Sequence, residues 1–196
     1  SGTVYLVYRI AREVTPLASP LAGGTEGSGA LALGAMALTA FNPMFLFITA
    51  SVNNDNLVVM LCTLALWLMV RISESANQEI GKSANRQIGD ARYAPLLLGL
   101  VLGLAALSKV SGLGLYPLAA LTIAVVGWRK RSWRWLFQAG GIVFGLAAII
   151  AGWWYLRNWQ LYGDPTGLAM MVAVAGPRSP VPTLWQLAAE WRGFVM

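Results

Sequence analysis

The sequence predicts an all-α protein, a polytopic bundle of transmembrane helices with about five full spans and part of another at the N-terminus. Of its 196 residues, 57% are apolar and 11% are charged, whereas an average soluble domain has roughly 25% charged residues. Nine tryptophans are present, and four of them lie beside charges at the ends of apolar runs, where indole rings settle at a bilayer interface. These four are Trp128, Trp133, Trp135 and Trp159.

The apolar runs that are long enough to cross a bilayer, at about 20 residues each, define the elements in order. The predicted spans are 1–12 (the end of one span), 29–50, 56–72, 94–108, 112–128 and 135–156, followed by amphipathic outer segments over 157–196. The Pro- and Gly-containing stretch 13–28 predicts a loop, and Pro43 should kink the span that contains it, because proline removes a backbone hydrogen bond. All spans belong to one transmembrane domain, 1–196, which we expect to be a fragment of a longer chain.

Residues 94–128 form an almost continuous apolar stretch that is interrupted at Lys109. One long helix and a hairpin of two shorter spans both fit its length. A single span would place the basic cluster 129–131 on the opposite side of the membrane from Arg71 and Arg92, against the positive-inside rule. The charges therefore predict a hairpin with Lys109 at its turn.

This topology sorts the 14 basic residues very unevenly. One side holds ten of them, Arg9, Arg12, Arg71, Lys82, Arg86, Arg92, Arg129, Lys130, Arg131 and Arg134; the other holds Lys109, Arg157, Arg178 and Arg192. The positive-inside rule assigns the first side to the cytoplasm. The chain is thus predicted to lie in the cell (plasma) membrane with residues 51–55, 108–112 and 157–165 outside.

Composition also limits the chemistry. The net charge of +6 is explained by basic loops between spans, and no aromatic-basic motif indicates nucleic acid. The single cysteine, Cys62, lies in an apolar run, so no intrachain disulfide is possible. The absence of histidine excludes Ser-His triads, His metal ligands and haem ligation by His.

Polar residues at the outer ends of the spans are the candidate binding site. They are Asn53, Asn54, Asp55, Lys109, Arg157, Asn158, Tyr162 and Asp164. Each would be costly against hydrocarbon, and a lysine with an arginine suits a phosphate group. Simpler explanations stay open: Asp55 as a helix cap, Lys109 snorkelling to headgroups, Arg157 paired with Asp164, and the nearby aromatic residues as an interfacial belt.

Three motifs resemble segments of GT-C-type membrane glycosyltransferases, the group that is related to protein O-mannosyltransferases and aminoarabinose transferases (glycosyltransferase family 39-like). The first joins Phe41-Asn42-Pro43-Met44-Phe45 to Ser51-Val52-Asn53-Asn54-Asp55. The second is Leu107-Ser108-Lys109-Val110-Ser111-Gly112, and the third joins Gly152-Trp153-Trp154-Tyr155-Leu156-Arg157-Asn158 to Tyr162-Gly163-Asp164-Pro165. The resemblance covers residues 1 to about 168.

The resemblance implies an enzyme that moves a sugar from a polyprenyl-phosphate donor to an acceptor at the extracytoplasmic face. Lys109 and Arg157 would contact the donor phosphate, and Asp55 would orient the acceptor or a divalent metal. In such enzymes a carboxylate in the first outer loop is the general base. We expect that residue upstream of Ser1, because the helix and loop that carry it have no counterpart in these 196 residues.

Two other classes stay open. A non-catalytic accessory subunit of a larger, energy-transducing membrane complex would use apolar faces around Trp67 and Phe137 against other subunits, with its outer polar groups paired among themselves. A transporter would need an aqueous path across the bilayer and ionisable groups near its midplane. The partners expected in common are membrane lipids.

Overall fold

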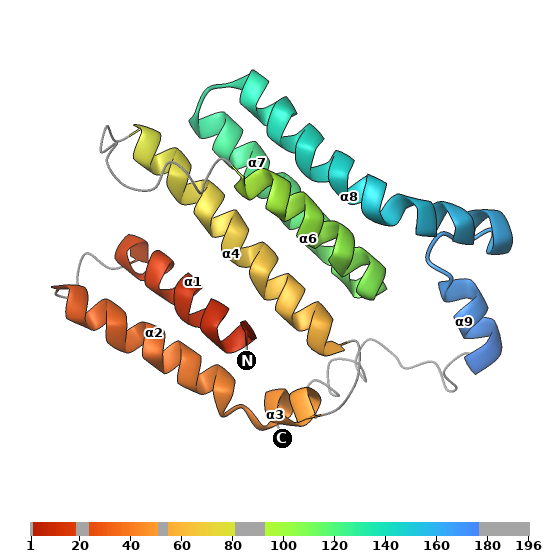
Figure 1. The fold of residues 1–196 in the computed structure, drawn as a ribbon, viewed down its shortest axis with the longest axis horizontal. Helices are drawn as coiled ribbons and strands as arrows, with labels where there is room; N and C mark the ends of the chain where they lie inside the picture. The colour runs from red at the N-terminus through yellow and green to blue at the C-terminus, as the bar shows by residue number, and fades with distance from the viewer. Residues whose placement is uncertain (1, 19–23, 51–54, 81–92, 177–196) are drawn as a thin grey trace, which may run out of the picture. The chain divides into compact units, whose positions relative to one another are not determined.

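The computed structural model describes residues 2–18, 24–50, 55–80 and 93–176, and in these ranges all regular structure is helical (Figure 1). The all-α prediction is therefore confirmed for the described residues. Two compact units are present, 1–153 and 154–196. The helices are α1 (Gly2–Ala18), α2 (Gly24–Ala40), α3 (Pro43–Ala50), α4 (Asp55–Ile80), α6 (Ala94–Ser108), the short 3₁₀ helix η1 (Val110–Gly114), α7 (Leu115–Arg129), α8 (Trp133–Tyr162) and α9 (Leu168–Ala175).

Within the described ranges, three helices are long and apolar enough to cross a membrane, or four if a bent pair is counted as one span. The three are Asp55–Ser75, Val110–Arg129 and Trp133–Tyr162, and the pair is Gly29–Ala40 with Pro43–Ala50. The apolar helix α6 has 15 residues, which gives about 22 Å at 1.5 Å per residue, less than the roughly 30 Å hydrocarbon core. Several long apolar helices indicate an integral membrane protein.

Prolines begin several helices. Pro43, Pro95 and Pro117 all lie in the first turn of a helix, where a missing N–H costs little. The predicted kink at Pro43 is confirmed, since the axes of the two flanking helices differ by 57°. Asn42 sits in the bend, and its side-chain Oδ1 accepts hydrogen bonds from the N–H groups of Met44 and Phe45, at 2.9 and 3.1 Å.

The loop predicted over residues 13–28 is largely wrong. Helix α1 continues to Ala18, and α2 already begins at Gly24. The reason is a tertiary contact, because the Glu13 carboxylate accepts a hydrogen bond from Trp67 of α4. Packing of this kind overrides local preference for a loop.

The predicted hairpin at Lys109 is observed. Lys109 has an extended backbone (φ −161°, ψ 142°) between α6 and η1. The Tyr116 hydroxyl donates to the carbonyl of Leu102 at 3.4 Å, whereas residues 14 apart in one straight helix would be separated by about 21 Å. Gly112 permits the reversal, since a Cβ there would lie 2.5 Å from the Ala105 carbonyl oxygen.

The core of the first unit lies where α4, α6, α7 and the first part of α8 meet (Figure 1). Its largest fully buried side chains are Leu98, Leu102, Val126 and Val143. Small residues allow α6 and α8 to approach closely. At Gly99 a Cβ would lie 2.7 Å from the Val143 carbonyl oxygen, and at Gly103 a Cβ would lie 2.8 Å from the Ile150 Cβ.

Candidate functional site

An ion pair joins two of the predicted site residues across 54 positions of sequence. The Lys109 ammonium group donates to Oδ1 of Asp55. Asp55 is the first residue of α4, and Lys109 follows the last residue of α6, so the pair ties together the ends of two packed helices. The side chain of Lys109 is 45% exposed and that of Asp55 is 38% exposed, which leaves both groups within reach of a ligand.

The local folding explains why these two charges meet. A carboxylate in the first turn of a helix is favoured by the helix dipole, which suits Asp55 at the start of α4. The extended backbone of Lys109 ends α6, and the following 3₁₀ helix turns the chain back. Burial of α4 against α6 through residues such as Leu61 and Leu102 sets the two ends side by side.

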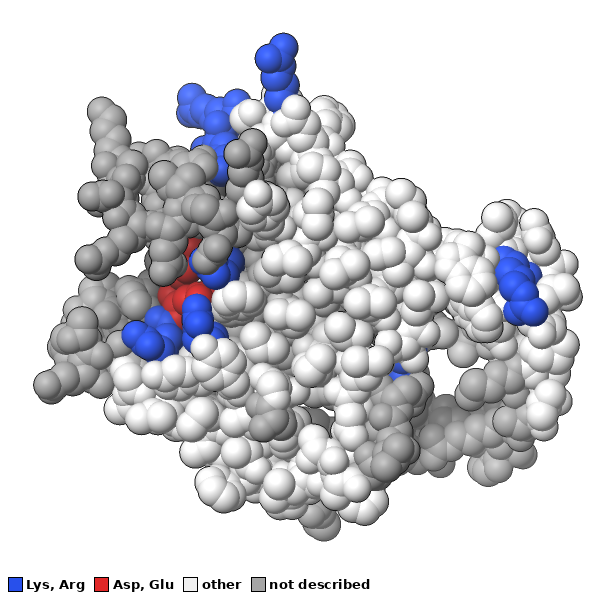
Figure 2. Space-filling view, in the orientation of Figure 1, with Lys and Arg blue, Asp and Glu red and all other residues white. Residues whose placement is uncertain are grey.

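Most other charges of the first unit lie at its opposite end. Asp55 and Arg71 are 16 residues apart in α4, which corresponds to about 24 Å along the helix axis. The basic residues of 129–134 lie at the turn between α7 and α8, which is at the top of the view in Figure 2. Apart from that turn and a cluster of charges at the left, the face of the first unit that Figure 2 shows is almost uncharged. Such a separation of charges is expected of a unit that spans a bilayer.

Two predicted site residues, Asn53 and Asn54, lie outside the described residues. They directly precede Asp55 in the sequence. Their part in the site stays a prediction.

The other four predicted residues belong to the second unit. Arg157 lies with its guanidinium carbon 5.6 Å from the centre of the Trp154 ring. Asn158 is buried, and its side-chain amide donates to the Pro165 carbonyl at 3.4 Å. Tyr162 is exposed at the last position of α8. Stacking holds Arg157 at the surface while its N–H groups can still reach an anion.

Asp164 organises the turn from α8 to α9. Its Oδ1 accepts hydrogen bonds from the N–H and the hydroxyl of Thr166, at 2.9 and 2.7 Å, and its Oδ2 accepts one from the N–H of Ala169 at 2.8 Å. The hydrogen bond from Ala169, followed by those from Thr166, lowers the pKa of the Asp164 carboxyl. A pair between Arg157 and Asp164 was one of the explanations left open, and no ion pair joins these two described residues. The contacts of Asp164 with Thr166 and Ala169 make it a structural group.

A second charged cluster was not predicted from the sequence. Trp67 donates from Nε1 to the Glu13 carboxylate at 3.2 Å, and the guanidinium carbons of Arg9 and Arg71 lie 5.5 and 5.1 Å from the centre of the Trp67 rings. Arg9 also pairs with Glu13 at 3.7 Å. The sequence contains two i, i+4 pairs that belong to this cluster, Arg9 with Glu13 and Trp67 with Arg71. Nothing in the sequence showed that the two pairs would meet.

No group of three or more Cys, Asp or Glu side chains that could hold a metal ion is found within the described ranges. A divalent cation at Asp55 therefore stays a prediction that rests on the family resemblance. Comparison of the chain with protein-family models, with curated proteins and with solved structures gave no match.

Proposed function

We propose that the chain is the membrane part of a glycosyltransferase that takes a sugar from a polyprenyl-phosphate donor at the extracytoplasmic face. The observation that carries the proposal is the exposed Asp55–Lys109 pair at the end of the first unit that has few other charges. A lysine at a membrane surface can hold the phosphate of a lipid donor, and the weak pairing of an exposed ion pair allows a phosphate to replace the carboxylate.

In this proposal the membrane topology has five full spans. The short helix α6 is the third of these five spans in chain order, and eight of its 15 residues are buried by neighbouring helices. The exposed face of α6 consists of leucines, and a bilayer accommodates a short span by thinning locally at a modest cost. The basic residues 129–134 then face the cytoplasm, and the Asp55–Lys109 pair faces outward, in the cell membrane.

The second unit has residues of its own that suit a lipid-linked sugar. Arg157 and Tyr162 are exposed, and the aromatic side chains of Trp154 and Trp159, near them in sequence, are also exposed. Indole faces pack against sugars and prenyl chains, and an arginine adds a planar fork for phosphate oxygens. We assign no general base to this chain.

An accessory subunit of a membrane complex is the second candidate, and two observations favour it. The outer charges Asp55 and Lys109 are paired with each other, and Phe137 is 72% exposed, as an interface residue would be. Trp67 does not fit, because its ring is covered by Arg9 and Arg71 of the same chain.

Binding of a polyprenyl phosphate separates the two candidates. We would measure its affinity for the purified chain in detergent, with the uncharged polyprenol of equal length as the matched lipid. The glycosyltransferase proposal expects Lys109→Ala to weaken binding of the phosphate about tenfold or more, since a charge-assisted hydrogen bond is lost, with the alcohol unaffected. Lys130→Ala, at the opposite end, should have no effect.

Equal binding of phosphate and alcohol, or an unchanged affinity in Lys109→Ala, would contradict the proposed role of this site. The accessory-subunit candidate would then be pursued by identifying membrane proteins that co-purify with the wild-type chain and are lost when Phe137 is replaced by a charged residue.

A further inference from the structure

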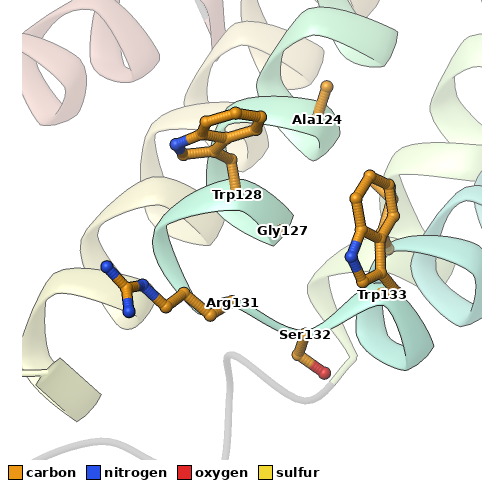
Figure 3. Close-up of a pocket in the computed structure, with 7 residues that line it drawn as sticks. Ala124, Gly127, Trp128, Arg131, Ser132 and Trp133 are labelled. Atoms are coloured by element: carbon orange, nitrogen blue, oxygen red, sulfur yellow. The ribbon is translucent and has the colours of Figure 1, made fainter.

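A hollow of about 480 Å³ lies at the turn between α7 and α8, far along both helices from the Asp55–Lys109 pair. It is mainly apolar, and it is lined by Ala124, Gly127, Trp128, Arg131, Ser132, Trp133 and Leu136. Figure 3 shows the indoles of Trp128 and Trp133 on either side of Gly127. The two indoles are 80% and 68% exposed, so they form open walls rather than a closed core.

The backbone of the turn places an arginine at one end of this hollow. The N–H of Ser132 bonds to the Gly127 carbonyl at 3.2 Å, and the N–H of Arg131 bonds to the Trp128 carbonyl at 3.1 Å. This pair of bonds is the Schellman arrangement, in which the residue with a left-handed backbone is usually glycine. Here that residue is Arg131, with φ 50°. A left-handed conformation costs an ordinary L-residue roughly 1–2 kcal/mol.

Side-chain chemistry gives a reason for keeping an arginine in this unfavourable conformation. Arg131 lines the hollow, and its guanidinium points away from Ser132 and Trp133, on the side where Trp128 lies (Figure 3). Ala124 lies at the other end of the hollow, one turn beyond Trp128 in α7 (Figure 3). Four basic residues fall within positions 129–134. The first turn of α8 begins at the same place, and a helix N-terminus favours an anion.

We propose that this hollow binds an anionic diacyl phospholipid. The acyl chain would lie between the two indoles toward Ala124, and the headgroup phosphate would lie at the rim, beside the guanidinium of Arg131. Charge complementarity identifies this occupant: an apolar hollow with a cationic rim at the end of two apolar helices matches a lipid with a negative headgroup. The proposal depends on the membrane assignment and not on glycosyl transfer.

The test is native mass spectrometry of the purified full chain with phosphatidylglycerol, and with phosphatidylcholine of the same acyl chains as the matched zwitterionic lipid. We expect phosphatidylglycerol to bind more tightly. Arg131→Gly should weaken its binding about fivefold, the effect of one cation near an anionic lipid. The melting temperature of the Arg131→Gly variant should not fall, because glycine adopts the left-handed backbone of position 131 without strain. Loss of binding without loss of stability distinguishes a ligand contact from a structural role.

Two further variants locate the site. Arg134→Ala removes an exposed cation that does not line the hollow, and it should leave binding unchanged. Ala124→Leu adds bulk at the apolar end, where Ala124 is exposed, and should weaken binding without altering charge. The proposal is overturned if phosphatidylcholine binds equally well, if Arg131→Gly has no effect, if Arg134→Ala costs as much as Arg131→Gly, or if Ala124→Leu leaves binding intact.

Discussion

The close approach of α6 to α8 makes Gly99 a position where one added methyl group should lower the stability of the fold. A Cβ at Gly99 would lie 2.7 Å from the Val143 carbonyl oxygen, 3.1 Å from the Val143 Cα and 3.2 Å from the Leu146 Cβ. Two of these neighbours are backbone atoms, so no rotamer change can make room. The helices must move apart, and overpacking of this kind costs about 1–3 kcal/mol.

Gly145→Ala in α8 is the matched control. It lies in a helix that also contributes Val143, but no described atom outside its own helical turn lies within 4 Å of its Cβ position. Both substitutions gain about 0.5–1 kcal/mol from replacing glycine inside a helix. This gain cancels in the comparison, so the difference between the variants is the packing cost.

The assay is denaturant-induced unfolding of the chain in micelles, followed by tryptophan fluorescence. We expect Gly145→Ala to be slightly more stable than the wild type and Gly99→Ala to be about 1–3 kcal/mol less stable than Gly145→Ala. Equal stability of the two variants would refute the inference that α6 and α8 pack through Gly99.

Three smaller effects are expected elsewhere. Asn42→Ala should lower the free energy of unfolding by about 1 kcal/mol, because it removes the cap of α3; circular dichroism melts would detect this, and an unchanged melting temperature would contradict the cap. The Asp164 carboxylate has a folded-state pKa below its ordinary value of 3.8, so it should stabilise the α8–α9 turn above about pH 3.8, with the effect lost as the pH falls through the lowered pKa. The protection of the Ala169 amide against exchange, relative to the unfolded chain at the same pH, should therefore fall in acid in the wild type but show no such step in Asp164→Asn. A double-mutant cycle on Asp55 and Lys109 should give a coupling energy under about 1 kcal/mol, because both side chains are partly exposed; a value several times larger would mean that the pair is structural.

Sequence reasoning located the bend at Pro43 and the turn at Lys109, because each of these residues has one physical role there. Pro43 cannot continue the hydrogen-bond ladder of a helix, so the bend at that position followed directly. Lys109 could not stay in hydrocarbon at low cost, and the distribution of basic residues then selected a hairpin. These arguments needed no knowledge of which helices are neighbours.

Helix pairing could be predicted only in part. The Gly99/Gly103 and Gly141/Gly145 pairs have the same spacing, which on its own predicts close helix packing for both. Only the first pair does so among the described residues; a Cβ at Gly141 or Gly145 would meet nothing within 4 Å. Glycine spacing indicates a surface that permits close approach, but the partner decides whether it is used.

The continuation of α1 beyond residue 12 was missed for a similar reason. Thr15 and Pro16 favour a helix end when the segment is read alone. The Glu13 carboxylate gains a hydrogen bond from Trp67, 54 residues away, and this contact is invisible in local sequence. Of the predicted site, the polar ends of α4 and α6 were recognisable one by one, and only the structure shows that Asp55 and Lys109 form a pair.

The pairing of Asp55 with Lys109 bears on which of them would bind a ligand, and Asp55→Asn can decide it. If Lys109 is the phosphate contact, the Asp55 carboxylate competes with the ligand for it. Removing the charge of Asp55 should then tighten polyprenyl-phosphate binding severalfold, because an exposed ion pair has only a small Coulomb energy. If Asp55 instead orients a divalent cation between protein and phosphate, the same substitution should weaken binding, and only when magnesium or manganese is present. Titrations of wild type and Asp55→Asn with and without the metal thus give opposite signs for the two roles. An affinity unchanged under both conditions would remove Asp55 from the site and leave it as the partner that holds the end of α6 against α4.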